Sequence, residues 1–278
     1  MSASGRGSVY RDGGAYYTPA QLAEGIVREV VVRHVLPNLR PEARTCPHVL
    51  EPSAGGAAFV RAVRRNLPRA HLVAMDVDPQ APVLALPWRW RFKAKAQDFL
   101  RLFRERCLCG HGLGSHLTSN GETRDCVNCE CRGWRDHPIT EPIHPAPATD
   151  LVVGNPPFGI PPDQARELYP ELEVPATRIK SPVPMAERHV RQAAALVAGR
   201  GSVVFLLRLA FLESQERRAL WRELPPRKVW TVVPRPGFLQ TSGNTDSTAY
   251  GVFWWDRLNP QLREPPGWLD WETGTTWG

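Results

Sequence analysis

The stretch DLVVGNPPFG, residues 150–159, decides how the rest of the chain is interpreted. Its apolar run predicts a short buried strand, which ends abruptly at Gly154, Asn155, two prolines and Phe158. A plain turn would not need a polar amide followed by two rigid residues and an aromatic ring. Ligands of open parallel sheets bind outside the carboxyl ends of the strands, so the combination predicts a binding or catalytic site here.

The segments on either side of this strand alternate between strand and helix patterns. Short apolar runs predict strands at residues 48–52, 70–79, 92–100 and 201–208. Apolar residues at helical spacing predict helices at residues 18–39, 53–67, 186–199 and 213–224. Two β-rich segments, residues 228–234 and 247–255, close the pattern. We therefore expect an α/β fold with a Rossmann-like, doubly wound, mostly parallel sheet and an antiparallel hairpin at its C-terminal edge.

Length and composition favour one large domain with a small insert. The chain has 278 residues and 42% of them are hydrophobic, which is enough for a substantial core. No stretch reaches the roughly 18 consecutive apolar residues of a membrane helix. The first residues show no apolar secretory segment. We therefore expect a cytoplasmic protein with no membrane partner.

The charge of the chain suits an anionic partner. The net charge is +7, the pI is about 9.4, and nearly all the cations are arginines. Arginine contacts phosphate in a bidentate manner and stacks on bases, so the balance favours nucleic acid. A GC-rich coding bias would produce the same abundance of Arg, Ala, Pro and Gly, so the charge alone does not decide between the two explanations.

The ends of the predicted strands carry side chains that suit a nucleoside cofactor. The first strand ends in a turn of Glu51, small residues and glycines, where a ligand can approach the backbone closely. Asp76 stands at the end of the second strand and is placed to accept hydrogen bonds from ribose hydroxyls. Asp98 and Phe99 stand at the end of the third, where an acid can accept from an adenine amine and a ring can cover the purine. Asn155 and its neighbours form a second polar and aromatic site beside these.

These landmarks, in this order, resemble the S-adenosylmethionine-dependent amino-methyltransferases, specifically the gamma-ordered adenine-N6 DNA methyltransferases. The residues that carry the resemblance are Tyr17-Thr18-Pro19, Glu51-Pro52-Ser53-Ala54-Gly55, Asp76, Asp98-Phe99 and Asn155-Pro156-Pro157-Phe158. The resemblance covers residues 16–105 and 148–255 and implies a class I methyltransferase fold. Any one motif is modest support, whereas five in the right order on the right elements are strong.

The resemblance assigns residues to two sets. The cofactor-binding set that it implies is Tyr17, Thr18, Pro19, Glu51, Pro52, Ser53, Gly55, Asp76, Val77, Asp98, Phe99 and Asn155. The catalytic set that it implies is Asn155, Pro156, Pro157 and Phe158. Two neighbouring positions have structural alternatives: Thr18 also fits the N-cap of the first helix, and Asp78 fits a turn better than a ligand.

The catalytic motif implies a mechanism for methylating an exocyclic amine. Such an amine is a poor nucleophile because its lone pair is conjugated into the ring. The resemblance implies that the Asn155 side-chain oxygen and the Pro156 carbonyl accept the two amine hydrogens, while Phe158 stacks on the base. Catalysis is then mainly positioning and hydrogen bonding. A paired base cannot reach such a pocket, so it must be flipped out or already unpaired.

A cysteine-rich segment interrupts the pattern and predicts a structural zinc site. A chain without an export signal is more typically metal-binding than disulfide-bonded when its cysteines cluster. Four ligands would come from the candidates Cys107, Cys109, His111, His116, Cys126, Cys129 and Cys131. Methyl transfer itself requires no metal. The alternative is a reduced loop without metal. Its role, whether contacting nucleic acid, contacting protein or bracing a loop, stays open.

These assignments divide the chain into four parts. We expect a loose N-terminus at residues 1–15, a catalytic domain at residues 16–106 and 136–258, the zinc-binding insert at residues 107–135 and a tail at residues 259–278. Residues 160–183 and 235–248 are expected to form loops beside the substrate.

The expected activity is methyl transfer from S-adenosylmethionine to the N6 amine of adenine in DNA, by an enzyme of the phage or orphan bacterial type. Related DNA enzymes usually carry a large recognition domain after the catalytic domain, and little chain follows Trp255 here. Specificity would then come from the insert, the loops or a partner subunit. The alternatives are the same chemistry on RNA, at adenine N6 or guanine N2, or on protein glutamine, and a non-catalytic nucleic-acid-binding subunit.

Overall fold

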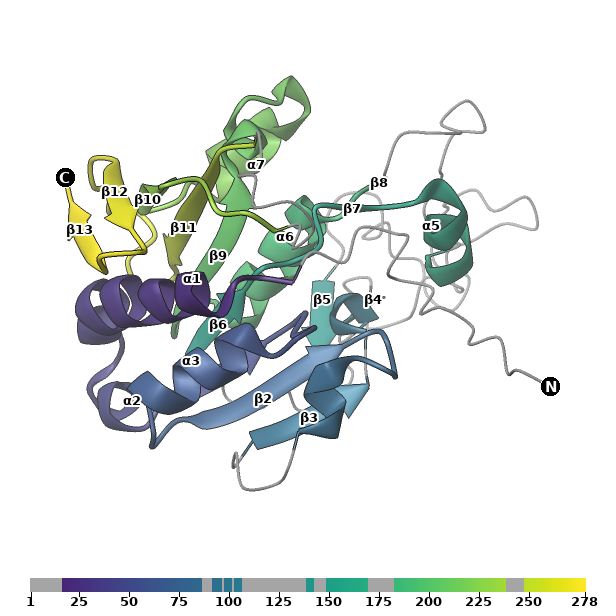
Figure 1. Ribbon diagram of the computed structural model, residues 1–278. Coiled ribbons are helices and arrows are strands. Elements are labelled where there is room, and N and C mark those ends of the chain that lie inside the picture. The colour runs from purple at the N-terminus through teal and green to yellow at the C-terminus, as the bar shows by residue number, and fades with distance from the viewer. Residues whose placement is uncertain are drawn as a thin grey trace. The chain divides into compact units, whose positions relative to one another are not determined.

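The computed structural model describes residues 17–86, 92–96, 98–101, 103–106, 139–142, 149–169, 183–238 and 248–278. Within these residues a nine-stranded sheet has the order β13-β12-β10-β11-β9-β6-β1-β2-β3 (Figure 1). Its strands are β1 (His48–Glu51), β2 (His71–Asp76), β3 (Phe92–Ala96), β6 (Leu151–Gly154), β9 (Ser202–Arg208), β10 (Lys228–Val233), β11 (Tyr250–Asp256), β12 (Gly267–Asp270) and β13 (Thr275–Trp277).

Five neighbouring strands of the sheet, β3, β2, β1, β6 and β9, all run parallel to one another. β1 pairs in parallel with β2 and β6, β2 with β3, and β6 with β9. β11 runs antiparallel to both β9 and β10 and lies between them. This arrangement confirms the predicted mostly parallel α/β sheet with an antiparallel hairpin formed by the last two predicted strands.

Helices connect the strands. The helical elements in chain order are α1 (Ala20–Gly25), η1 (Ile26–Val35), η2 (Leu36–Asn38), α2 (Pro41–Thr45), α3 (Ala58–Asn66), η3 (Pro82–Ala85), η5 (Phe99–Arg101), α5 (Pro162–Leu168), α6 (Ala186–Leu196), η7 (Leu209–Leu212), η8 (Gln215–Arg217) and α7 (Arg218–Glu223). α1 continues directly into η1, because the backbone stays helical at Ile26. None of the helices in the described part of the chain is long and apolar enough to cross a bilayer.

The sheet is covered on both faces, because its central strands are apolar on both sides. One face packs against α1, η1 and α3 (Figure 1). Leu151 and Val153 of β6 belong to the apolar cluster on this face. The other face carries Phe205 of β9, and α6 packs against this strand. Continuous apolar strands are typical of parallel sheets that are buried on both faces.

Asp150 ties the starts of three central strands together. Its side chain is buried, and its two oxygens accept hydrogen bonds of 2.9 Å from the His48 N–H and from the Arg40 guanidinium. Its backbone carbonyl accepts from the N–H of Ser202 at 2.9 Å, and its N–H donates to His48. The first residues of β1, β6 and β9 are therefore fixed relative to one another by one residue.

The C-terminal residues 259–278, expected as a tail outside the catalytic domain, instead extend the sheet. β12 pairs in parallel with β10, and β13 pairs antiparallel with β12. Leu269 of β12 is fully buried, whereas Trp268 beside it is exposed. The alternating pattern spans only four residues, GWLD, which is too short for periodicity to distinguish a strand from a turn.

Residues 100–147 form a second compact unit, larger than the predicted insert at residues 107–135. It contains β4 (Phe103–Arg106) and β5 (Ile139–Pro142), which pair antiparallel with Arg106 opposite Ile139. The chain therefore leaves this ribbon and returns to it at the same point. In the sequence, the candidate zinc ligands fall between β4 and β5, and they are outside the described residues.

We expect Gly201→Ala to destabilise the protein by about 2–4 kcal/mol. A Cβ at Gly201 would overlap the backbone carbonyl of Asp150, which cannot move without disturbing the three strand starts. Urea unfolding measures the change. The control is Gly199→Asn, because Gly199 has φ +68° and open space around it, and asparagine tolerates that backbone conformation. Equal stability of the Gly201 variant and the wild type would contradict this account of the close approach.

Candidate active site

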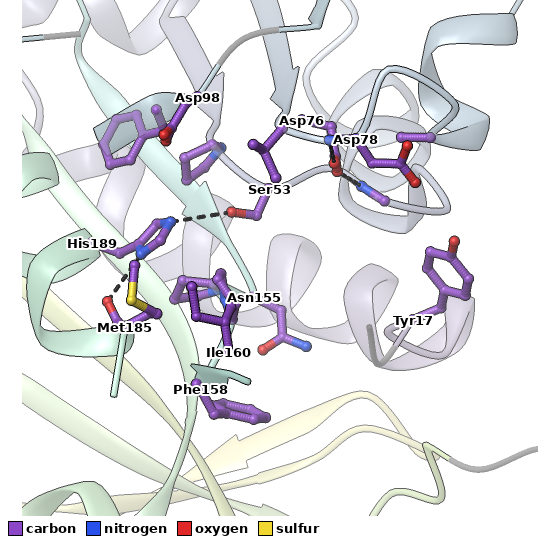
Figure 2. Close-up of a pocket in the computed structure, with 18 of the residues that line it drawn as sticks. Tyr17, Ser53, Asp76, Asp78, Asp98, Asn155, Phe158, Ile160, Met185 and His189 are labelled. Atoms are coloured by element: carbon purple, nitrogen blue, oxygen red, sulfur yellow. Dashed lines mark hydrogen bonds between the residues drawn. The ribbon is translucent and has the colours of Figure 1, made fainter. Parts of the chain in front are cut away.

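A cavity of about 140 Å³ lies at the carboxyl ends of β1, β2 and β6 (Figure 2). The predicted site residues that line it are Tyr17, Pro52, Ser53, Gly55, Asp76, Val77, Asp98, Phe99, Asn155, Pro156, Pro157 and Phe158. Because parallel strands end at one edge of the sheet, residues far apart in sequence meet there. The structure therefore brings together most of the side chains that the sequence singled out.

Asn155 has an oriented side chain with one unused acceptor. Its Nδ2 donates to the hydroxyl of Thr18 at 3.1 Å, which fixes the amide. Its Oδ1 is buried and has no hydrogen-bond partner among the described residues. A buried acceptor without a partner costs free energy, about 1–3 kcal/mol, so the arrangement indicates a position where a ligand donor is expected.

Asp76, the last residue of β2, holds the glycine turn that follows β1. The Asp76 carboxylate accepts the Gly55 N–H at 2.7 Å and the Asp78 N–H at 2.9 Å. Burial raises the pKa of Asp76, and these hydrogen bonds partly oppose the rise. Gly55 has φ +44°, a conformation that favours glycine, and a Cβ there would lie 3.0 Å from the Tyr17 ring. The turn therefore presents bare backbone beneath an aromatic ring.

Glu51 lies next to the cavity but does not line it. Its side chain is 2% exposed, and its Oε2 has no hydrogen-bond partner in the described part of the chain. Burial, followed by the negative charge of Asp76, raises the pKa of Glu51 well above its usual range, while a hydrogen bond from the backbone of Val60 lowers it. Such a carboxyl is poised to gain from a nearby positive charge.

His189 of α6 is a cavity residue that the sequence analysis missed. Burial lowers the pKa of His189 to about 4, so its ring is neutral at neutral pH. Its Nδ1 lies 3.0 Å from the carbonyl of Met185, which can only accept, so Nδ1 carries the proton. Its Nε2 then accepts from the Ser53 hydroxyl, 3.5 Å away (Figure 2). The ring also stacks on Phe99, with centroids 5.6 Å apart.

This histidine connects the two halves of the cavity. The N–H of Met185 donates to the carbonyl of Phe158 at 3.2 Å, and the Met185 carbonyl accepts from His189. The chain of contacts therefore runs from Phe158, on the Asn155 side, to Ser53 in the turn after β1. A signal was present in the sequence, because His189 stands on the apolar face of a helix whose buried residues recur at helical spacing.

Tyr169 is a second residue that the sequence analysis missed. It follows α5 directly, is 6% exposed, and its hydroxyl donates to Asp98 at 3.3 Å. The expected substrate loop at residues 160–183 begins and ends in a short ladder, in which β7 (Gly159–Ile160) pairs with β8 (Val183–Pro184). The hydrogen bond from Tyr169 therefore links Asp98 to the chain segment that follows the Asn155 motif.

Three predicted cofactor residues do not line the cavity: Thr18, Pro19 and Glu51. Thr18 accepts the hydrogen bond from Asn155, and Pro19 precedes the first residue of α1. Asp78, interpreted as a turn acid, does cap its turn by accepting from the Gln80 N–H, and it also lines the cavity. The seven candidate zinc ligands lie outside the described residues, and the described residues contain no cluster that could hold a metal.

Comparison with solved structures shows which known folds this domain resembles. One is a crystal structure from Vibrio vulnificus that is described as the modification subunit of a type I restriction enzyme. The alignment covers 91% of this chain and 46% of the Vibrio chain, with 13% identity and a TM-score of 0.51. An assigned class I S-adenosylmethionine-dependent methyltransferase from Listeria monocytogenes aligns over 88% of this chain and 60% of its own, with 13% identity and a TM-score of 0.48. The alignment with the Vibrio subunit shows that this chain shares its fold, a mostly parallel α/β sheet with an antiparallel hairpin.

The similarity extends to the fold and no further. No family model matches the sequence, and no curated protein matches it either. The chain spans about half the length of the Vibrio subunit and 60% of the Listeria protein. Low identity shows the fold alone, so the chemistry of the site has to be argued from its own residues.

We expect His189 to make the stability of the domain sensitive to mild acid. Its folded-state pKa lies below its ordinary value, so the unfolded chain binds the proton more readily, and stability is lost as pH falls from about 6.5 towards 4. The loss from this residue is about 2 kcal/mol between pH 7 and pH 5. Urea unfolding at the two pH values should show a smaller loss for His189→Gln. The exposed His71→Gln is the control and should keep the wild-type pH dependence, and an equal loss in all three proteins would refute the assignment.

Proposed function

We propose that this protein transfers a methyl group from S-adenosylmethionine to the exocyclic N6 amine of adenine in DNA. The observation that carries the proposal is the Asn155 amide. Thr18 holds its Nδ2, and this leaves a buried Oδ1 with no partner among the described residues. An acceptor held in one orientation beside a cavity suits an N–H donor of a substrate. The exocyclic amine of a base is such a donor.

The residues beside the cavity fit S-adenosylmethionine, which supplies an electrophilic methyl group on a positively charged sulfur. Glu51 offers a buried carboxyl oxygen without a partner, which suits a cationic ligand group. Asp76 has a carboxylate with remaining acceptor capacity at the place where a ribose is expected. Gly55 provides bare backbone for close approach. Phe99 and Asp98 line the same cavity and suit an adenine ring and its amine.

The chain's own residues then position the amine. Asn155 Oδ1 accepts one amine hydrogen, and the carbonyl of Pro156, a residue of the same cavity, accepts the other. Both contacts draw the nitrogen lone pair out of conjugation and aim it at the methyl group. Phe158 supports the base by stacking. Because the cavity cannot admit a paired base, the base reaches it flipped or unpaired.

Two observations support DNA as the proposed substrate: the positive charge of the chain and its structural similarity to a restriction-enzyme subunit. The net charge of +7 rests almost entirely on arginines. The structure with the higher TM-score quoted above is described as a modification subunit of a restriction enzyme. We propose that target recognition comes from loops beside the cavity, from residues 100–147 or from a partner subunit. A structural zinc held by the cysteine-rich segment also stays a proposal, supported by the clustering of Cys and His.

We expect Asn155→Ala to lower the methylation rate by about 10²–10³-fold, while affinity for S-adenosylmethionine changes little. The assay uses tritiated S-adenosylmethionine with duplex DNA, single-stranded DNA, ribosomal RNA and total protein in parallel, and mass spectrometry of the digested product. Asn66→Ala is the matched control, because that amide bonds Glu24 and the Ala62 carbonyl within the helical layer, away from the cavity.

Wild-type label in DNA as N6-methyladenine, lost in the Asn155 variant, supports the proposal. Label in RNA or protein keeps the chemistry and replaces the substrate. Bound cofactor with no label in any substrate contradicts a self-sufficient enzyme and indicates a required partner subunit.

We expect Glu51→Gln to stabilise the cofactor-free protein at neutral pH and to weaken cofactor binding. A raised pKa means that Glu51 favours folding only at low pH, and this contribution is lost as pH rises through the folded-state pKa. The variant should therefore gain about 1–3 kcal/mol at pH 7.5 and little near pH 4. Thermal unfolding and calorimetry with S-adenosylmethionine measure the two effects. The exposed Glu213→Gln is the control, and unchanged cofactor affinity in the Glu51 variant would remove Glu51 from the binding site.

A further inference from the structure

Arg208 lies beside the ring that the proposed function assigns to the target base. It is the last residue of β9, and β9 pairs with β6, the strand that leads into Asn155. The guanidinium of Arg208 covers the ring of Phe158, with its carbon 4.7 Å from the ring centroid. Arg208 therefore contacts a residue that lines the cavity, and it comes from a different strand than the proposed catalytic motif does.

An aromatic wall holds the Phe158 ring in place beneath this guanidinium. Tyr250 is the cross-strand partner of Arg208, so the two side chains lie on the same face of the sheet. Its ring is 1% exposed and lies 5.9 Å from Phe158 and 4.6 Å from Phe238. The wall fixes Phe158 from the core side, and the guanidinium occupies ring surface that a ligand could use.

The charge of Arg208 has no acidic partner among the described residues. Its Nε is buried without a hydrogen-bond acceptor there. Arg227, by contrast, contacts Asp256 and Glu264, each at 2.7 Å. An arginine stays protonated in proteins, so it retains both its positive charge and its planar set of donors. Among the described residues, no anionic group neutralises the charge of Arg208 or accepts a hydrogen bond from its Nε.

A nucleotide supplies what this pair of side chains lacks. A flat base fits the Phe158 ring, and a phosphate accepts two parallel hydrogen bonds from a guanidinium. A glutamine side chain offers neither an aromatic plane nor a negative charge. We propose that Arg208 binds a backbone phosphate next to the target nucleotide, and so selects nucleic acid over protein at the proposed methylation site. The inference rests on the proposed function of this site.

The same geometry assigns Arg208 two positions. Without substrate the guanidinium covers the Phe158 ring, and a base cannot occupy that surface at the same time. When the base arrives, the guanidinium leaves the ring and turns to the phosphate, which its long side chain allows. Arg208 is thus a positioning residue that protects the stacking surface and then anchors the backbone of the substrate.

The test compares Arg208→Gln with the wild type on two versions of one oligonucleotide. Both contain a single adenine, in the strandedness that the wild-type protein methylates, and one version has uncharged methylphosphonates on both sides of that adenine. For the wild type we expect the methylphosphonates to lower kcat/KM at least about tenfold, because a charge-assisted contact is lost. For Arg208→Gln, kcat/KM on the normal oligonucleotide should already be low, and the methylphosphonates should lower it little further.

Two controls keep the result specific. Arg200→Gln changes an exposed arginine at the opposite end of β9 and should respond to methylphosphonates as the wild type does. Calorimetry should give Arg208→Gln unchanged affinity for S-adenosylmethionine, which shows that the domain is folded. If DNA is methylated but the Arg208 variant remains as sensitive to methylphosphonates as the wild type, the phosphate role is wrong and the proposed function stands. If only protein is methylated, both are wrong.

Discussion

The buried carboxylate of Asp150 is the constraint on which the rest of the domain depends. It joins the starts of β1, β6 and β9 through its side chain and its backbone. Parallel strands advance by about 3.3 Å per residue, so fixing where they begin also fixes where they end. The far ends of these three strands carry Glu51, Asn155 and Arg208. A structural contact at one edge of the sheet therefore sets the geometry of the cavity at the other.

Three buried polar atoms in or beside the cavity have no hydrogen-bond partner in the described part of the chain. Asn155 Oδ1 belongs to a residue that lines the cavity, whereas Glu51 Oε2 and Arg208 Nε belong to residues beside its lining. The three atoms differ in charge and in donor or acceptor character. Groups of this kind lower the stability of the empty protein and are tolerated at functional sites. Their variety is informative, because it describes a ligand pair with a cation, an N–H donor and an anion.

The sequence predicted the parts of this arrangement that depend on local pattern. Apolar runs located β1, β2, β6 and β9, and the residues after β1, β2 and β6 proved to line one cavity. It did not reveal contacts with distant partners. The resemblance assigned Thr18 to the cofactor, and no local pattern reports its hydrogen bond to Asn155, which is 137 residues away in the sequence. His189 resembled an ordinary residue of an apolar helix face, and no local pattern reports that Ser53 lies beyond it.

The pairing of the two strands that flank the cysteine-rich segment has a consequence for how this protein can evolve. Arg106 and Ile139 are paired neighbours in the β4–β5 ribbon, so the two ends of the chain between them lie side by side. A hairpin turn of a few residues could join the same two strands. A change in the length of this segment is therefore compatible with the same pairing of β4 and β5 and with the same strand order of the main sheet. Under the function proposed above, the segment can diverge in sequence separately from the residues that line the cavity.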